Sequence, residues 1–158
     1  MIVEGKLAPA FDLPSDDGGR VKLSEMRGKT VVVYFYPKDD TSGCTLEAQQ
    51  FTLLAAKFKA AGAMIIGVSP DSVASHCKFR DKYDLGVTLA SDEDTKVCQA
   101  YGVWTEKSMY GRTYMGVERT TVLIDPKGKI AKVWSKVKVP DHAAQVLAAV
   151  EALGATKR

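Results

Sequence analysis

Cysteine is scarce in this chain, and no two cysteines have the spacing of a redox or metal motif. Only three cysteines occur among 158 residues. A small, odd number argues against a disulfide framework and favours a reducing compartment, so we expect a cytoplasmic protein. The C-x-x-C motif of disulfide oxidoreductases is absent, and the two histidines lack H-x-x-x-H spacing. We therefore expect no metal site.

Long apolar runs and an excess of one charge are also missing. No segment approaches the length of a membrane span. The N-terminal residues MIVEGKLAPAF lack the basic and apolar regions of a secretory signal. The net charge is only +3, with basic residues dispersed among acids, so we expect neither a nucleic-acid nor a membrane partner. The length predicts one domain over residues 1–158, large enough to form a core without covalent staples.

What the chain does contain is a strand, a tight polar loop and a helix, in that order, within residues 30–58. Residues 31–36 (VVVYFY) form a continuous apolar run, which is typical of a strand buried on both faces. Pro37 ends this strand because proline cannot donate to a ladder. A polar turn follows, and the later apolar residues recur at helical spacing.

Cys44 opens the predicted helix. A helix N-terminus carries unpaired N–H groups and a partial positive charge, which favour a thiolate over a thiol. The thiolate is the nucleophilic form of cysteine. Most cysteines are small, buried and inert, but Cys44 follows Thr-Ser-Gly in a polar loop and does not lie on an apolar stripe. We therefore predict that Cys44 is a reactive nucleophile.

The rest of the chain alternates between strand and helix patterns. We expect a hairpin over residues 10–23, a helical turn at 24–28, a loop at 104–116, strands at 64–69, 87–90, 120–125 and 130–139, and helices at 71–83, 91–101 and 141–153. This order predicts a mixed α/β sheet with helices on both faces. The first two long strands should pair in parallel through a right-handed crossover, which places the Cys44 loop at the carboxyl end of a central strand.

The segment PKDDTSGCTLEA, preceded by VVYFY, resembles the active-site signature of the peroxiredoxins. It is most similar to their bacterioferritin comigratory protein, or peroxiredoxin Q, branch, and the resemblance continues through SVASHCKF, LASDEDTKVCQAYGVW and MYGRTYMGVERTTVLIDPKGKI. The resemblance implies a thioredoxin-like α/β fold. It also implies a thiol-dependent peroxidase, without a cofactor, that reduces hydrogen peroxide and organic hydroperoxides through a cysteine sulfenic acid. Thioredoxin or another external thiol would be the reductant, and relatives in this branch are often monomers.

The resemblance also implies roles for individual residues. Cys44 would be the peroxidatic cysteine, Thr41 would hydrogen-bond the thiolate and the peroxide, and Arg119 would keep the sulfur ionised and bind the peroxide. Without the resemblance, Arg119 is typical of a surface ion pair with Glu118 or another acid. Supporting roles are implied for three neighbours: Pro37, Gly43 and Glu47.

Two positions depart from the pattern of this branch. Ser42 stands where relatives often carry proline, and Gln49 stands where many carry the resolving cysteine. Other members place a resolver on the next helix, at the position of Arg80, whereas this chain has Cys77 three residues earlier. Either Cys77 resolves the sulfenic acid after local unfolding, or an external thiol reduces it directly. We expect Cys98 to be inert.

Two further expectations concern function and His142. The missing resolver also suits a redox-sensing protein in which oxidation of Cys44 controls contacts with a partner. His142 is expected on a solvated first turn of the last helix.

Overall fold

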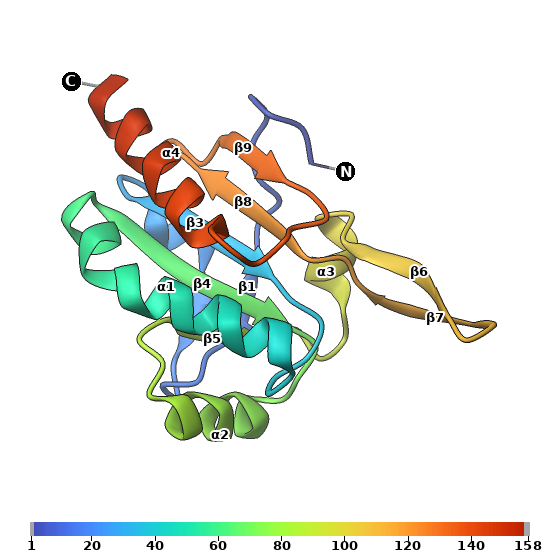
Figure 1. Cartoon of the computed structure of the whole chain (residues 1–158). Coiled ribbons are helices and arrows are strands. Elements are labelled where there is room, and N and C mark those ends of the chain that lie inside the picture. Colours follow the sequence, from blue (N-terminus) through green and yellow to red (C-terminus); the bar gives the residue numbers. More distant parts are fainter. Residues whose placement is uncertain (1, 157–158) are drawn as a thin grey trace.

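A five-stranded mixed sheet forms the centre of the fold in a computed structural model that describes residues 2–156. The strand order is β5-β4-β3-β8-β9 (Figure 1). Strand β3 pairs in parallel with β4 and antiparallel with β8, so the predicted parallel pair is confirmed. The bounds are β3 (Thr30–Phe35), β4 (Ala63–Ser69), β5 (Thr88–Ser91), β8 (Thr120–Ile124) and β9 (Ile130–Trp134).

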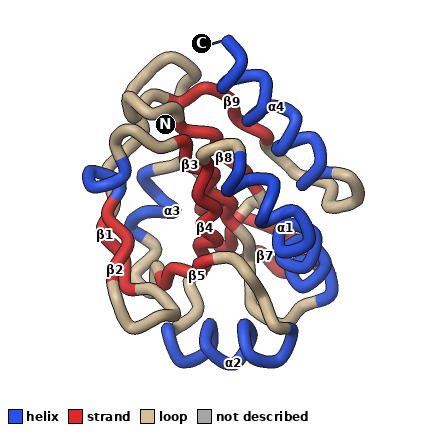
Figure 2. The backbone as a smooth tube through the Cα atoms, turned by 90° about the vertical axis from the view of Figure 1, so that its left-hand side faces the viewer, coloured by secondary structure: helices blue, strands red, loops and turns tan. Residues whose placement is uncertain are grey.

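Helices lie on both faces of this sheet, as the sequence predicts. Helices α1 (Ser42–Ala60) and α4 (His142–Thr156) cover one face (Figures 1 and 2). The short α3 (Lys96–Ala100) and the N-terminal hairpin cover the other (Figure 2). That hairpin consists of β1 (Asp12–Pro14) and β2 (Arg20–Lys22) and leads into the 3₁₀ turn η1 (Leu23–Met26). Helix α2 (Val73–Tyr83) packs near β5 at the edge of the sheet.

Strand β3 is buried along its whole length because both of its faces meet hydrophobic cores. Val31, Val33 and Phe35 enter the core beneath α3 and the N-terminal hairpin. Val32 and Tyr34 enter the core beneath α1 and α4. Apolar side chains on both faces explain the absence of polar alternation. The carboxyl end of β3 is therefore fixed from both sides, which gives the following loop a rigid starting point.

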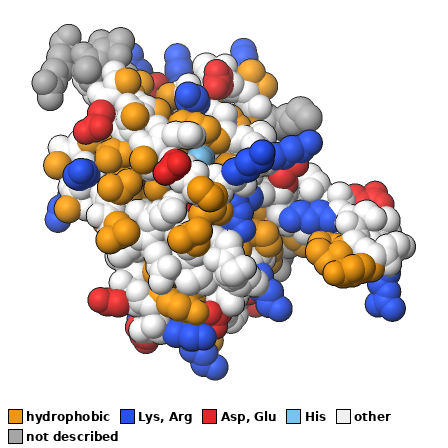
Figure 3. Space-filling model, viewed as in Figure 1, with side chains coloured by type: hydrophobic (Ala, Val, Ile, Leu, Met, Phe, Trp, Pro, Cys, Tyr) orange, Lys and Arg blue, Asp and Glu red, His pale blue; other side chains and the backbone are white. Residues whose placement is uncertain are grey.

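The segment predicted as a loop at residues 104–116 is instead a β-hairpin. Strands β6 (Trp104–Met109) and β7 (Arg112–Val117) pair antiparallel and project from the body of the molecule (Figure 1). Tyr110 and Gly111 form the turn with φ values of 52° and 76°, as a two-residue hairpin turn requires. Most of these residues are exposed, so their sequence shows no inward-facing alternation. The exposed large hydrophobic side chains of the hairpin are Met109, Tyr110, Tyr114 and Met115. Hydrophobic side chains are visible on the projecting hairpin in Figure 3.

Two predicted elements are shorter than expected. Strand β9 ends at Trp134, and Lys136 takes a φ of 49°, which an extended strand does not allow. Helix α3 covers only residues 96–100, because Thr95 adopts a φ of 61° and Ser91 belongs to β5. Within residues 2–156, no helix is long and apolar enough to cross a membrane.

Candidate active site

Cys44 lies in the first turn of α1, directly after the loop that follows β3. Thr41 is the N-cap residue, and the first helical hydrogen bond runs from Thr45 N to the Thr41 carbonyl at 2.8 Å. The N–H groups of the first turn, including that of Cys44, therefore precede the helical ladder and place positive potential at this end of α1. The Cys44 side chain is almost fully buried. The structure thus places the predicted nucleophile where the sequence puts it.

Arg119 reaches Cys44 from the segment between β7 and β8. Its Nη2 donates to Cys44 Sγ at 3.3 Å, and its Nη1 donates to Glu47 Oε1 at 2.6 Å. Gly43 permits this approach, because a Cβ at that position would lie 3.2 Å from Nη2. Burial lowers the pKa of Arg119, but the negative charges of Glu47 and Cys44 outweigh it and raise the pKa overall. Arg119 therefore presents a permanent charge to the sulfur instead of forming a surface ion pair with Glu118.

Glu47 is the buried acid that holds Arg119 in place. It lies one turn after Cys44 on α1 and is 1% exposed. Burial raises the pKa of Glu47 to about 7, although the charge and hydrogen bond of Arg119 act in the opposite direction. Its second oxygen, Oε2, is buried and accepts no hydrogen bond within the described residues. A proton on Oε2 would thus remove the charge that opposes Arg119, while Oε1 could still accept its hydrogen bond.

Replacing Glu47 with glutamine should change how stability depends on pH. The carboxyl pKa of Glu47 rises from 4.5 to about 7 on folding, so folded protein binds its proton more tightly than unfolded protein does. This group therefore stabilises the fold below pH 4.5, and the stabilisation is lost as pH rises through 7. The unfolding free energy of the parent protein, measured in urea, should fall relative to Glu47→Gln by about 3 kcal/mol across that range. A constant difference between the two proteins would contradict this assignment.

Thr41 and Pro37 flank the same loop, but the structure shows a different contact for Thr41 from the one implied by the resemblance. The Thr41 hydroxyl donates to the Lys38 carbonyl at 2.9 Å. Its single hydrogen is thus directed into the loop, and only its lone pairs are free to accept. Contact with a thiolate as donor would require rotation of this hydroxyl. Pro37 is half-buried at the point where the chain leaves β3.

His142 does not lie on a solvated helical turn, so that expectation is wrong. It is buried, and its Nε2 lies 2.7 Å from Thr121 Oγ1 on β8. Burial, followed by the charge of Arg119, lowers the pKa of His142 to about 4. The preceding Asp141 has a φ of 63°, which turns His142 inward against the ring of Trp134. The helical periodicity of the sequence contains no signal for this turn.

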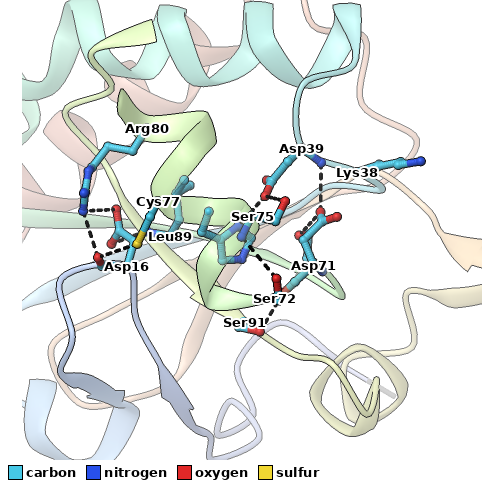
Figure 4. Close-up of polar contacts among 12 residues, drawn as sticks. Asp16, Lys38, Asp39, Asp71, Ser72, Ser75, Cys77, Arg80, Leu89 and Ser91 are labelled. Atoms are coloured by element: carbon cyan, nitrogen blue, oxygen red, sulfur yellow. Dashed lines mark hydrogen bonds and ion pairs between the residues drawn. The ribbon is translucent and has the colours of Figure 1, made fainter. Parts of the chain in front are cut away.

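A second polar cluster is formed by Asp39, Asp71 and His76. Figure 4 shows its two aspartates side by side. Asp39 follows β3, Asp71 follows β4, and His76 belongs to the first turns of α2. One ligand-type atom from each residue lies within 4.8 Å of the others. The cluster could not be predicted from the sequence, because its members are dispersed along the chain and share no spacing motif.

The other two cysteines have different surroundings. Cys77 Sγ donates to the Asp16 carbonyl at 3.3 Å, and Arg80 Nη1 donates to the same carbonyl at 2.8 Å (Figure 4). Cys77 therefore faces the turn of the N-terminal hairpin. Cys98 is fully buried, and burial together with Asp92 raises its thiol pKa far above the usual range. Such a thiol stays protonated and unreactive.

Comparison with known proteins identifies relatives across most of the chain. The AhpC/TSA family model matches residues 5–133. The chain is 48% identical to peroxiredoxin Bcp of Bacillus subtilis over 93% of this chain and 94% of that protein. It is 44% identical to peroxiredoxin Bcp of Escherichia coli over 87% of this chain and 88% of that protein.

A solved structure supports the same relationship. It comes from work on the alkyl peroxide reduction activity of the bacterioferritin comigratory protein of Xanthomonas campestris, with trapped intermediate and ligand complexes. It superposes on this chain with a TM-score of 0.90 at 42% identity, and it covers 96% of this chain and 99% of that one. The predicted thioredoxin-like fold is thereby confirmed.

Proposed function

Because this chain belongs to the AhpC/TSA family of peroxiredoxins, we propose that Cys44 is its peroxidatic nucleophile, with Arg119 as the residue that activates it. The chain is a thiol-dependent peroxidase. The observation that carries the residue assignment is the Arg119 fork, which joins Cys44 Sγ to the buried carboxylate of Glu47. Cys77 and Cys98 lack this arrangement, since one faces a carbonyl and the other is held protonated by burial.

The proposed reaction begins with attack of the Cys44 thiolate on one oxygen of a hydroperoxide. A sulfur–oxygen bond forms while the oxygen–oxygen bond breaks, and Cys44 loses two electrons to become a sulfenic acid. The leaving oxygen takes up a proton and departs as water or an alcohol. Negative charge moves from sulfur to that oxygen, and the guanidinium of Arg119, whose Nη2 donates to Cys44 Sγ, would stabilise this charge. One preorganised donor of this kind is worth roughly 3–4 kcal/mol in comparable sites.

We propose that an external thiol, with thioredoxin as the favoured candidate, completes the cycle. The sulfenic acid condenses with one external thiol and releases water. A second thiol then displaces Cys44 and forms the external disulfide. The contacts of Cys77 support this course, because its sulfur is directed to the Asp16 carbonyl beside Arg80. Pairing with Cys44 would require both helical turns to open.

Replacing Cys77 with serine should leave peroxide turnover close to that of the parent protein. Turnover is measured with thioredoxin, thioredoxin reductase and NADPH, because the external thiol does the resolving in this account. A collapse of turnover, with sulfenic acid formation still intact, would instead identify Cys77 as the resolver. Sustained turnover also separates a peroxidase from the redox-sensing alternative, in which oxidised Cys44 would persist to alter partner contacts.

The wider context of the protein is also proposed. Residues 1–158 would form one domain that acts as a monomer in the cytoplasm. The described residues support the single domain, because the two hydrophobic cores share one sheet. The three cysteines are free thiols, which fits a reducing compartment. The similarity to peroxiredoxins of the Bcp branch supports the monomeric state.

The proposed substrates are hydrogen peroxide and alkyl hydroperoxides. The alkyl hydroperoxides are included because the Xanthomonas campestris relative reduces alkyl peroxides.

A further inference from the structure

The loop that leads into Cys44 is anchored to α2 by one buried carboxylate. The Asp39 side chain is 4% exposed, although it lies in a polar loop. It accepts a hydrogen bond from Ser75 at 2.8 Å (Figure 4). It also accepts one from Tyr36 at 2.6 Å, and its Oδ2 lies 2.8 Å from His76 Nδ1. The backbone N–H of Asp39 donates to Asp71 Oδ2 at 2.8 Å. Both carboxylate oxygens and the backbone N–H of Asp39 are thus engaged by other side chains.

The contacts of His76 require it to carry a positive charge. Its Nε2 lies 2.9 Å from the Ala90 carbonyl of β5, while its Nδ1 faces Asp39. A neutral imidazole has one N–H and a carbonyl cannot donate, so two such contacts need two ring protons when Asp39 is ionised. The titratable groups facing the ring are the carboxylates of Asp39 and Asp71, from two loops, and the hydroxyl of Tyr36, which directly follows β3. Burial lowers the pKa of His76, but Asp39 outweighs it and raises the pKa overall.

A bound cation explains this cluster less well than a proton does. The two oxygens that face the cluster each have two partners already: Oδ2 of Asp39 has Ser75 and His76, and Oδ2 of Asp71 accepts from Ser69 at 2.6 Å and from the backbone N–H of Asp39. A metal at either atom would have to displace one of these partners. The ring protons of His76 supply the positive charge that the two carboxylates need.

We propose that His76 is a positioning residue for the oxidation of Cys44. As an imidazolium it holds Asp39, and through it the loop of residues 37–41, in the arrangement that sets the first turn of α1 against Arg119. This role rests on the proposed function of Cys44. His76 touches neither the sulfur nor the peroxide, so it acts only through the loop.

The same loop has a second side-chain contact with α2, which provides a matched control for the contact between Asp39 and His76. Asp40 accepts from Lys82 Nζ at 2.8 Å and from the Tyr83 hydroxyl at 2.6 Å. The side chains of this ion pair are 42% and 58% exposed, in contrast to the buried pair of His76 and Asp39. Exposed pairs contribute little, whereas removal of one partner of a buried pair leaves an uncompensated charge. The two contacts thus differ in burial, although both join the loop before Cys44 to α2.

Three variants test the proposal through the second-order rate constant for oxidation of Cys44 by hydrogen peroxide, followed by rapid quenching and mass spectrometry. His76→Gln should lower this constant by about 10- to 100-fold, since small displacements of reacting groups have effects of that size. Lys82→Met, the control, should stay within about twofold of the parent. Asp39→Asn should retain most of the rate, because its amide can donate to Nδ1 of a neutral His76.

The pH profile separates positioning from a general loss of stability. In the parent protein, neutral His76 keeps only one N–H, so it loses a hydrogen bond either to the Asp39 carboxylate or to the Ala90 carbonyl, and the rate should decline on the alkaline side. The stabilisation from His76 should likewise be present below pH 6.5 and disappear as pH rises through its elevated pKa. The Asp39→Asn protein should show no such alkaline decline, because its pair is neutral throughout.

Clear outcomes would overturn the inference. The inference would be wrong if His76→Gln reacted at the parental rate, or if His76→Gln and Lys82→Met lost rate equally. It would also be wrong if the pH profiles of the parent and Asp39→Asn superposed. If His76→Gln does not fold, the Asp39→Asn profile and nitrogen-15 NMR of the parent decide the matter. A neutral His76 at pH 6.5 in that spectrum would contradict the proposal. Peroxide turnover that survives Cys44→Ser would instead defeat the proposed function, so the two failures are distinguishable.

Discussion

Replacing Cys44 with serine should abolish peroxide reduction. The expected fall in rate is on the order of 10⁴-fold or more, because a serine hydroxyl is not ionised at neutral pH and forms no sulfenic acid. The substitution is close to isosteric, and Arg119 can still donate to the new oxygen. The urea midpoint should therefore change little, which separates lost chemistry from lost folding.

Cys98 provides the matched control for this substitution. It is another buried thiol, but it lies against Asp92, far along the chain from the Arg119 fork. Cys98→Ala should keep turnover near the parental value once any loss of stability is accounted for. Retention of peroxidase activity by Cys44→Ser, or an equal loss in both variants, would contradict the assignment of the nucleophile.

Replacing Arg119 with methionine should slow the oxidation of Cys44 by about 10²- to 10³-fold, as expected for loss of a preorganised donor at the site of charge transfer. The variant loses both the contact with Cys44 Sγ and the contact with Glu47 Oε1. Arg119→Lys should recover only part of this loss, because an ammonium lacks the planar fork that reaches both atoms at once. The measurement is the second-order rate constant of sulfenic acid formation with hydrogen peroxide.

The effect of Arg119→Met on folding should depend on pH. Without the guanidinium, Glu47 is a buried carboxylate with no opposing charge, so its pKa should rise further and it should bind a proton. The double variant with Glu47→Gln removes that charge and should recover stability above pH 7 without recovering the rate. Recovery of the rate in the double variant would show that Arg119 acts only as a structural partner for Glu47.

The unit of β3, α1 and β4 could be predicted from sequence because local and global signals agree there. The apolar run of β3 has no polar residue to place in solvent, and the helical spacing of α1 begins at a polar loop. The position of Cys44 follows from those two elements alone. The role of Arg119 came from the resemblance to a family, since its partner Glu47 lies 72 positions away in sequence.

The features that could not be predicted from the sequence are those for which neither burial nor periodicity produces a local pattern. Strands β6 and β7 are held by pairing with each other, so their largely exposed side chains show no alternation. His142 faces the core because of the left-handed turn at Asp141, which a helical pattern does not reveal. The pairing of Asp39 with His76 joins residues 37 positions apart, and each of them is typical of a solvated loop or helix when taken alone.

The most direct test of the account is the mass of the intact protein after one equivalent of hydrogen peroxide, with a sulfenic acid trap and subsequent peptide mapping. The account predicts one trapped adduct on Cys44, with Cys77 and Cys98 recovered as free thiols. A peptide that links Cys44 to Cys77 would keep the nucleophile but contradict the external-thiol cycle. Recovery of Cys44 as an unmodified thiol, while peroxide is consumed, would contradict the account as a whole.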